Sequence, residues 1–123
     1  MEKVVNIEHC FGMFADTYSP KIVGELNGQH IKLVRVEGDK CPWHTHDNED
    51  EMFFVIEGAL DIQEREGMVA VRAGEFYIVR RNREHRVVPH GHVSLILFEP
   101  AGTAHTGKVR TEITKDHYDW LEF

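Results

Sequence analysis

Short runs in which apolar and polar residues alternate fill most of the chain between residues 30 and 99. HIKLVRVE (30–37) is the clearest, and MFFVIE, ALDIQE, MVAVR, FYIVR, HRVV and VSLILFE follow at short intervals. Turn formers separate them: Gly38, Gly58, Gly67, Gly74, Arg81-Asn82 and Pro89-His90-Gly91. Weaker runs at 22–26, 43–46 and 109–113 raise the expected number to about ten strands. The pattern predicts an all-β sandwich or barrel with little helix.

Helical signals are confined to the two ends. The stretch NIEHCFGMF (6–14) predicts one short helical turn with Asn6 as its cap, and KDHYDWLEF (115–123) predicts another. The first 26 residues include Phe11, Phe14, Tyr18 and Ile22, which is more apolar surface than a free tail tolerates. We therefore expect this N-terminal arm to pack on its own barrel or on that of a partner.

Length and charge narrow the setting. A chain of 123 residues suits one domain, and 14 basic against 21 acidic residues give a net charge of −7, which disfavours nucleic acid as a partner. No apolar run approaches transmembrane length and the first twenty residues contain no signal-peptide pattern, so we expect a cytoplasmic protein without a membrane partner. Cys10 and Cys41 fit reduced thiols, and the alternative is a single disulfide between them.

The stretch CPWHTHDNEDEMFFVIEG (41–58) is the strongest candidate for chemistry. In a strand, His44 and His46 point to one face about 7 Å apart, close enough for both imidazoles to reach one ion. Glu51 begins the next run and can add a carboxylate oxygen. Such a set suits Fe, Mn, Ni, Cu, Co or Zn, while the alternative is a polar loop that is merely rich in His and acid.

A fourth ligand should come from a distant strand, and His85, which opens the run HRVV, is the candidate. Arginines surround it at positions 80, 81, 83 and 86. One of them could clamp an anionic substrate, but we expect them to pair with the acids of residues 47–50 or with solvent. His90 and His92 repeat the H-x-H pattern but are expected in a turn with no glutamate at a suitable spacing, and the isolated His9, His105 and His117 are expected to be exposed or structural.

Strand phase also predicts which apolar side chains surround such an ion. Residues two and four positions after Glu51, two after His85, and two in the run VSLILFE should point inward. The expected lining residues are Phe53, Val55, Val87, Leu95 and Leu97.

These residues carry a resemblance to the cupin family. Gly38, His44, His46, Glu51 and Gly58 match its first motif, G-x5-H-x-H-x4-E-x6-G, at residues 38–58 without a gap. The second motif, G-x5-P-x-G-x2-H-x3-N at residues 74–89, is met at Gly74 and His85 but departs from the pattern at Arg80, Asn82 and Pro89. The short inter-motif segment and the C-terminal stretch FEPAGTAHTG also resemble small single-domain cupins of the conserved-barrel type.

The resemblance implies a double-stranded β-helix, or jelly-roll barrel, in which His44, His46, Glu51 and His85 hold one divalent transition metal. It also implies a small-molecule ligand and a homodimer. The metal could serve a dioxygenase, or an isomerase or lyase, acting on a small polar molecule. The alternative is a module that binds a sugar or a small acid without catalysis.

Overall fold

The computed structural model describes residues 1–123 and contains one short helix and seven strands. These are α1 (Ile7–Phe11), β1 (Lys21–Leu26), β2 (Gln29–Val36), β3 (Glu51–Glu64), β4 (Gly67–Arg72), β5 (Phe76–Val79), β6 (His85–Pro100) and β7 (Asp119–Trp120). The expectation of an all-β chain with little helix is confirmed, with seven strands in place of about ten.

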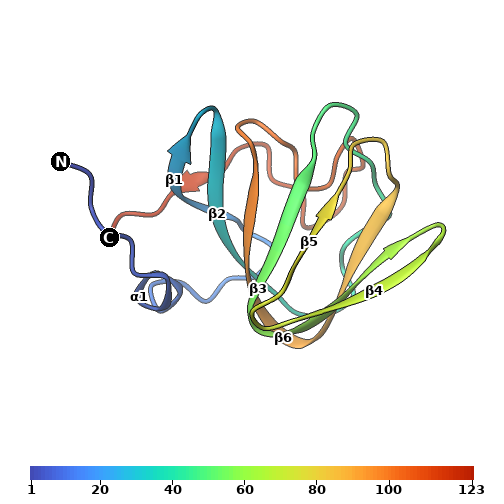
Figure 1. The fold of residues 1–123 in the computed structure, drawn as a ribbon, viewed down its shortest axis with the longest axis horizontal. Coiled ribbons are helices and arrows are strands. Elements are labelled where there is room, and N and C mark those ends of the chain that lie inside the picture. Colours follow the sequence, from blue (N-terminus) through green and yellow to red (C-terminus); the bar gives the residue numbers. More distant parts are fainter.

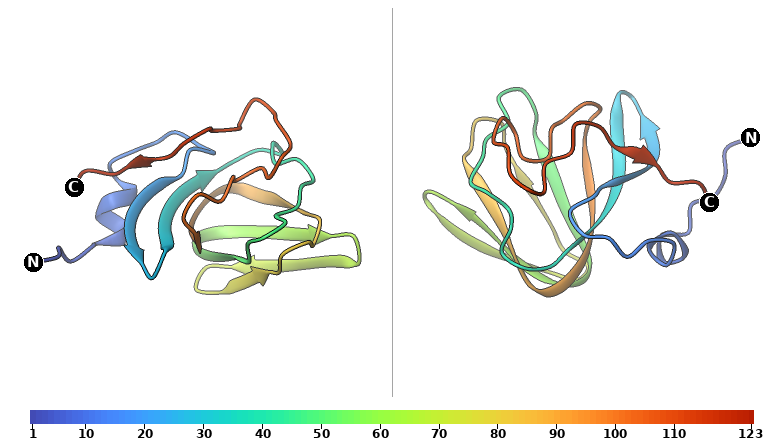
Figure 2. Two further views of the ribbon diagram at one scale, coloured as in Figure 1. Left: turned by 90° about the horizontal axis from the view of Figure 1, so that it is seen from above. Right: turned by 180° about the vertical axis from the view of Figure 1, so that it is seen from behind.

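The strands form one strongly curved sheet in the order β4-β3-β6-β2-β1-β7, in which β5 also pairs with β3. Figure 1 shows β3 and β6 at the centre of this arrangement, and Figure 2 shows the sheet curling around an interior that the C-terminal segment crosses on one side. All these pairings are antiparallel except that of β1 with β7. Because the sheet curls, one face of the neighbouring strands β3 and β6 is turned toward a common interior.

Two predicted turns lie inside long strands. MFFVIE and ALDIQE are one strand, β3, because Gly58 forms part of a β-bulge where the pairing with β6 shifts register. A Cβ at Gly58 would lie 2.6 Å from the carbonyl oxygen of His92, so only glycine fits where β6 passes this closely. HRVV and VSLILFE likewise join in β6, and Pro89-His90-Gly91 does not interrupt it.

The sequence pattern predicted the secondary structure correctly at the N-terminal end of the chain and wrongly at the C-terminal end. The N-terminal helical turn is present, and the Asn6 side chain accepts a hydrogen bond from the backbone of His9 as a cap should. The expected helix at 115–123 is wrong: Asp119–Trp120 is a short strand parallel to β1. Residues 109–113 form no strand, and residues 43–46 contribute only an isolated bridge at His44.

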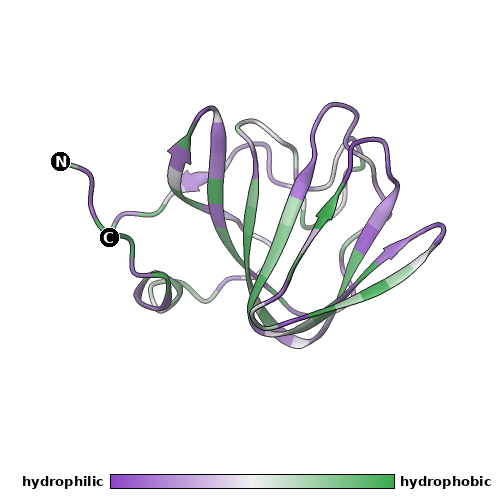
Figure 3. Cartoon of the chain, in the orientation of Figure 1, coloured by the Kyte–Doolittle hydropathy of each residue, from purple (hydrophilic) through white to green (hydrophobic).

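The apolar core has two parts. Inward side chains of the strands from β2 to β6, with Tyr18 and Ile113 from the connecting segments, form the interior cluster. A smaller cluster of Cys10, Phe11, Val23 and Leu33 lies between α1 and the outer face of the sheet. The N-terminal arm thus packs against its own sheet. Figure 3 shows apolar and polar residues alternating along the strands, as burial on one face requires.

The helix α1 is far too short to cross a membrane, and no helix of the structure meets that requirement.

Candidate metal centre

Four buried side chains converge inside the barrel. His44 and His46 come from the irregular segment between β2 and β3, while Glu51 and His85 are the first residues of β3 and β6. One nitrogen or oxygen of each lies within 4.8 Å of the corresponding atoms of the other three. Each of the four residues is at most 5% exposed. The structure therefore brings together the whole set that the sequence singled out.

Backbone hydrogen bonds fix the orientation of two imidazoles. His44 Nδ1 lies 2.8 Å from the carbonyl oxygen of Pro42, and His85 Nδ1 lies 2.9 Å from that of Arg83. Because a carbonyl can only accept, each Nδ1 must carry the proton and donate it. Each Nε2 is left with a free lone pair that points at the cluster, as a metal ligand requires.

The four converging atoms have no hydrogen-bond partner. His44 Nε2, His46 Nε2, His85 Nε2 and Glu51 Oε1 are buried and unsatisfied, and the carboxylate oxygen lies 3.3 and 3.5 Å from the nitrogens of His46 and His85. Unsatisfied buried polar atoms are rare because each loses its water without compensation. One ion would satisfy all four at once, and three imidazoles with one carboxylate form a donor set that divalent transition metals accept. The cluster suits a single metal ion.

Burial and mutual charge set the protonation of the cluster. Burial lowers the pKa of His44 to about 4, and the nearby His85 acts in the same direction, so this ring is neutral at pH 7. Burial acts to raise the pKa of Glu51, but the neighbouring Glu99, His46 and His85 favour its charged form and hold the pKa well below its usual range. A neutral imidazole and an ionised carboxylate are the forms that bind metal.

A buried, hydrogen-bonded lysine–glutamate pair lies beside Glu51. Lys32 Nζ donates to Glu99 Oε1 at 2.8 Å, and both side chains are fully buried. The Lys32 ammonium also lies 4.0 Å from the centre of the Tyr118 ring. Burial, with the charge of Glu51 beside it, raises the pKa of Glu99 well above its usual range. Sequence reasoning missed this pair, although Lys32 shares the inward phase of Val34, and Glu99 that of Leu97.

A small cavity of about 50 Å³ adjoins the cluster and is walled on one side by His44 and Glu51. Of the side chains expected to line it, four do so: Phe53, Val87, Leu95 and Leu97. Val55 is buried in the same apolar cluster but does not reach the cavity. The other walls come mainly from Val34, Val36 and Ile113.

His105 also lines the cavity, where sequence reasoning had expected an exposed or structural residue. Its Nε2 accepts a hydrogen bond from the backbone of Lys115 at 3.0 Å, and burial lowers its pKa to about 4. The ring is therefore neutral at pH 7. The sequence signal that could have placed His105 at the cavity is its position in the stretch FEPAGTAHTG, because this segment crosses one side of the barrel.

The other candidate polar residues lie outside the cavity. Arg80 and Arg81 both pair with Asp50 of the first motif loop, as expected. Arg83 pairs with Glu64 and Glu66, and Arg86 binds Gln63 and lies near Asp39. His90 bonds to Asp61, and His92 lies beside Arg35 and Glu37. None of these side chains belongs to the group formed by His44, His46, Glu51 and His85, and none forms a second group of possible metal ligands.

Comparison with known proteins agrees with this geometry. The family model described as "Cupin domain" matches residues 33–99, which include both motifs. A cupin-2 domain containing protein from Shewanella frigidimarina has a TM-score of 0.76 and 35% identity over 79% of this chain and 94% of its own. A protein from Neisseria meningitidis has a TM-score of 0.72 and 27% identity over 80% and 100% of the two chains.

A sugar phosphate isomerase from a cupin superfamily, from Silicibacter pomeroyi, shares the fold with a TM-score of 0.54 and 21% identity over 64% of this chain and 54% of its own. No curated protein matches the chain in sequence. The unbroken first motif, the curled sheet with its buried three-histidine, one-glutamate cluster, and the matched residues 33–99 all agree, and the chain belongs to the cupin family.

Proposed function

We propose that this protein holds one divalent transition metal through His44, His46, Glu51 and His85 and uses it to act on a small molecule in the adjoining cavity. The observation that carries the proposal is the set of four buried ligand atoms without any other partner. When bound, the metal would act as a Lewis acid toward an oxygen of the ligand, and a redox-active ion would also be able to bind dioxygen. The identity of the metal is left to experiment among Fe, Mn, Ni, Cu, Co and Zn.

Within this proposal, an oxygenation fits the cavity better than an isomerisation or an elimination. Moving a proton between carbons requires a free acid or base beside the ligand. The polar side chains on the wall other than His44 and Glu51 are Tyr18, Cys41 and His105, and all three are hydrogen-bonded to backbone. A dioxygenase depends less on such a group, because the metal and dioxygen supply the reactivity.

The chain's own residues then have three tasks. The backbone carbonyls of Pro42 and Arg83 hold two imidazoles with Nε2 toward the ion. Lys32 and Glu99 support Glu51 from behind, and the apolar wall keeps water from the reacting ligand. Ligand binding without turnover is the second candidate function, favoured by the same lack of a free acid or base.

Metal content is the first test. Protein purified without tag or chelator should contain close to one transition metal per chain by elemental analysis. The double variant His46→Ala, Glu51→Ala should lose it, whereas His90→Ala, His92→Ala should keep it, because those histidines lie outside the cluster. Full metal in the first double variant would overturn the ligand assignment.

Turnover separates the two candidate functions. The metal-loaded protein should consume dioxygen in an oxygen electrode when given short 2-oxo acids or diketones, and the double variant should not. Saturable binding with the ligand recovered unchanged, under air and with each of the six metals, would favour the binding module.

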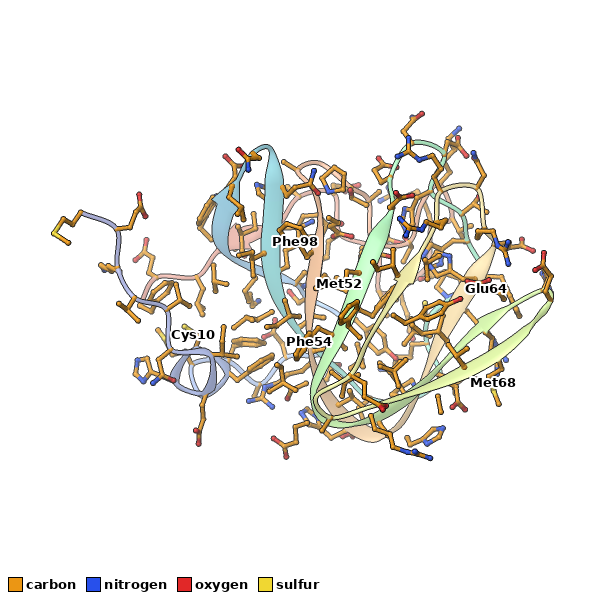
Figure 4. The ribbon with its side chains drawn as sticks, in the orientation of Figure 1. Cys10, Met52, Phe54, Glu64, Met68 and Phe98 are labelled. Atoms are coloured by element: carbon orange, nitrogen blue, oxygen red, sulfur yellow. The ribbon has the colours of Figure 1, made fainter.

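We further infer that the protein works in the cytosol as a homodimer. Both cysteines are free, which suits a reducing compartment. Met52 and Phe98 lie opposite each other on β3 and β6, and Figure 4 shows them beside Phe54, on whose ring the exposed Phe76 stacks. Such an apolar outer face suits a second copy of the chain. Sedimentation of the purified protein would test this.

A further inference from the structure

We infer that the ligand of this site is a short molecule with one oxygen-donor head and a hydrocarbon body, of the class of unsubstituted short 2-oxo acids, and not a sugar, a polyol or a phosphate ester. This inference rests on the proposed function, because the head is assigned to the metal. It narrows the ligand by what the rest of the cavity can accept.

The size of the cavity sets the first limit. Its volume is about 50 Å³, well below the about 300–1,000 Å³ of ordinary ligand pockets. A ligand with one or two carbons beyond its metal-binding head fits such a space, whereas a hexose does not.

The charge of the wall sets the second limit. Among the thirteen residues that line the cavity, nine are hydrophobic and Glu51 is the one with a formal charge at pH 7. No lysine or arginine lines the cavity. A phosphate on the far end of a ligand would have no cation to pair with, and burying an unpaired dianion is strongly unfavourable. The one place for a negative head is therefore beside the metal.

Hydrogen bonding sets the third limit. The Tyr18 hydroxyl donates to the carbonyl oxygen of Gly38, and the Cys41 thiol to that of Pro42. His105 accepts from the backbone of Lys115 through Nε2, and its ring donates a second hydrogen bond to the backbone of Ile113. The polar hydrogens of the wall groups away from the cluster are thus already committed to the protein. The oxygen of a hydroxyl on the ligand body would therefore be buried without a donor.

Two nearly isosteric acids test this directly. 2-Oxobutyrate and 3-hydroxypyruvate share the 2-oxo acid head and differ by a methyl in place of a hydroxyl. Protein loaded with Co²⁺ would be titrated with each acid, with visible absorption reporting binding at the metal and calorimetry giving the dissociation constant. We expect 2-oxobutyrate to bind about tenfold tighter or more, because the hydroxyl loses water and gains no partner. Glucose 6-phosphate should leave the cobalt spectrum unchanged.

A variant that adds a hydroxyl to the wall provides the control. Val36→Thr places a hydroxyl on the cavity side of β2 with nearly unchanged volume, and should reduce the preference for 2-oxobutyrate. Val69→Thr makes the same change on the outside of β4 and should leave the preference as it is. Thermal melting and cobalt content would establish that both variants fold and bind metal.

The outcomes separate the two proposals. A protein that takes up no metal overturns the proposed function, and this inference falls with it. A metal-loaded protein that prefers 3-hydroxypyruvate, binds both acids equally, binds neither, or responds to glucose 6-phosphate overturns only the inference about the ligand.

Discussion

The backbones of His44 and His85 exchange two hydrogen bonds, of 3.0 and 2.9 Å, in an isolated β-bridge. Their ring centroids lie 4.3 Å apart. The bridge links the irregular segment that carries the first motif to the start of β6, forty-one residues later in the chain. A further hydrogen bond of 2.9 Å, from the backbone of Asn82 to the carbonyl oxygen of His46, links the same two regions. The cluster is therefore assembled by main-chain contacts that do not depend on an ion.

Metal should stabilise the folded protein markedly. The four ligand atoms have no other partner, so an ion that binds the native chain and not the unfolded one shifts the equilibrium toward folding. At free metal about one hundred times its dissociation constant, the gain is about 2.7 kcal/mol. Chelation should lower the melting temperature, and addition of metal should restore it. An equal response in the variant His46→Ala, Glu51→Ala would mean that the ion stabilises the chain elsewhere.

Lys32→Met should destabilise the protein by about 3–5 kcal/mol, because it removes the buried cation beside Glu99 and Glu51, whose coupled carboxyl groups together keep a negative charge. The matched change Lys108→Met breaks an ion pair with Asp47 of nearly the same length, 2.9 Å, in which the lysine side chain is 91% exposed. It should cost much less, because water screens the exposed pair. Urea unfolding of both variants gives the comparison. Similar small losses would show that the buried pair is no more stabilising than the surface one.

The sequence predicted the cluster better than it predicted the strands that carry it. His44, His46 and Glu51 lie within eight residues, so strand alternation nearly fixes their relative placement, and His85 follows from a motif spacing. In contrast, the local sequence predicted turns at Gly58 and Gly91. In the structure both have positive φ but lie within long strands, where neighbouring strands determine that the chain continues.

The cavity wall was only partly predictable for a related reason. Phe53 and Leu97 follow from strand phase, which depends on the local sequence. His105 and Ile113 reach the cavity from a segment without regular structure, and no periodicity reports where such a segment crosses the barrel. Lys32 and Glu99 share the inward phase of their strands, but a buried charge is credible only once its partner is known.

Acid should destabilise the metal-free protein partly through His105. Its folded pKa is about 4 against an ordinary value of 6.5: burial lowers it, Lys32 and Lys115 act in the same direction, and Glu51 opposes them. Between these two values the unfolded chain binds more protons, so stability falls as pH drops from 6.5 to 4 and is unaffected above that window. His44 contributes with the same sign, and His46, whose pKa is raised, opposes it.

His105→Gln isolates this contribution, because glutamine keeps a hydrogen-bonding side chain that does not titrate. Urea unfolding of metal-free protein at pH 7.5, 6 and 5 should show a shallower loss of stability in the variant. The ring is partly exposed, so the difference should be less than the about 1.4 kcal/mol per pKa unit of a fully buried group. Parallel pH profiles for the two proteins would place the acid sensitivity elsewhere.

Gly107→Ala should weaken metal binding although Gly107 is not a ligand. Gly107 has a φ of 58°, and a Cβ there would collide with the carbonyl oxygen of Thr45, which lies between His44 and His46. The collision partner is backbone, so the first motif loop itself must move. Displacing groups that orient metal ligands typically costs about 10–100-fold in affinity. Gly102→Ala is the matched control, because Gly102 also has a positive φ, of 88°, but faces no atom within 4 Å.

Both alanine variants should therefore lose stability from backbone strain, of order 1–3 kcal/mol. Only Gly107→Ala should also lose metal affinity, measured by competition with a coloured chelator at fixed pH. If the two variants bind metal equally well, the segment after β6 does not set the position of His44 and His46, and the main-chain hydrogen bonds to His85 and Asn82 are sufficient to hold them.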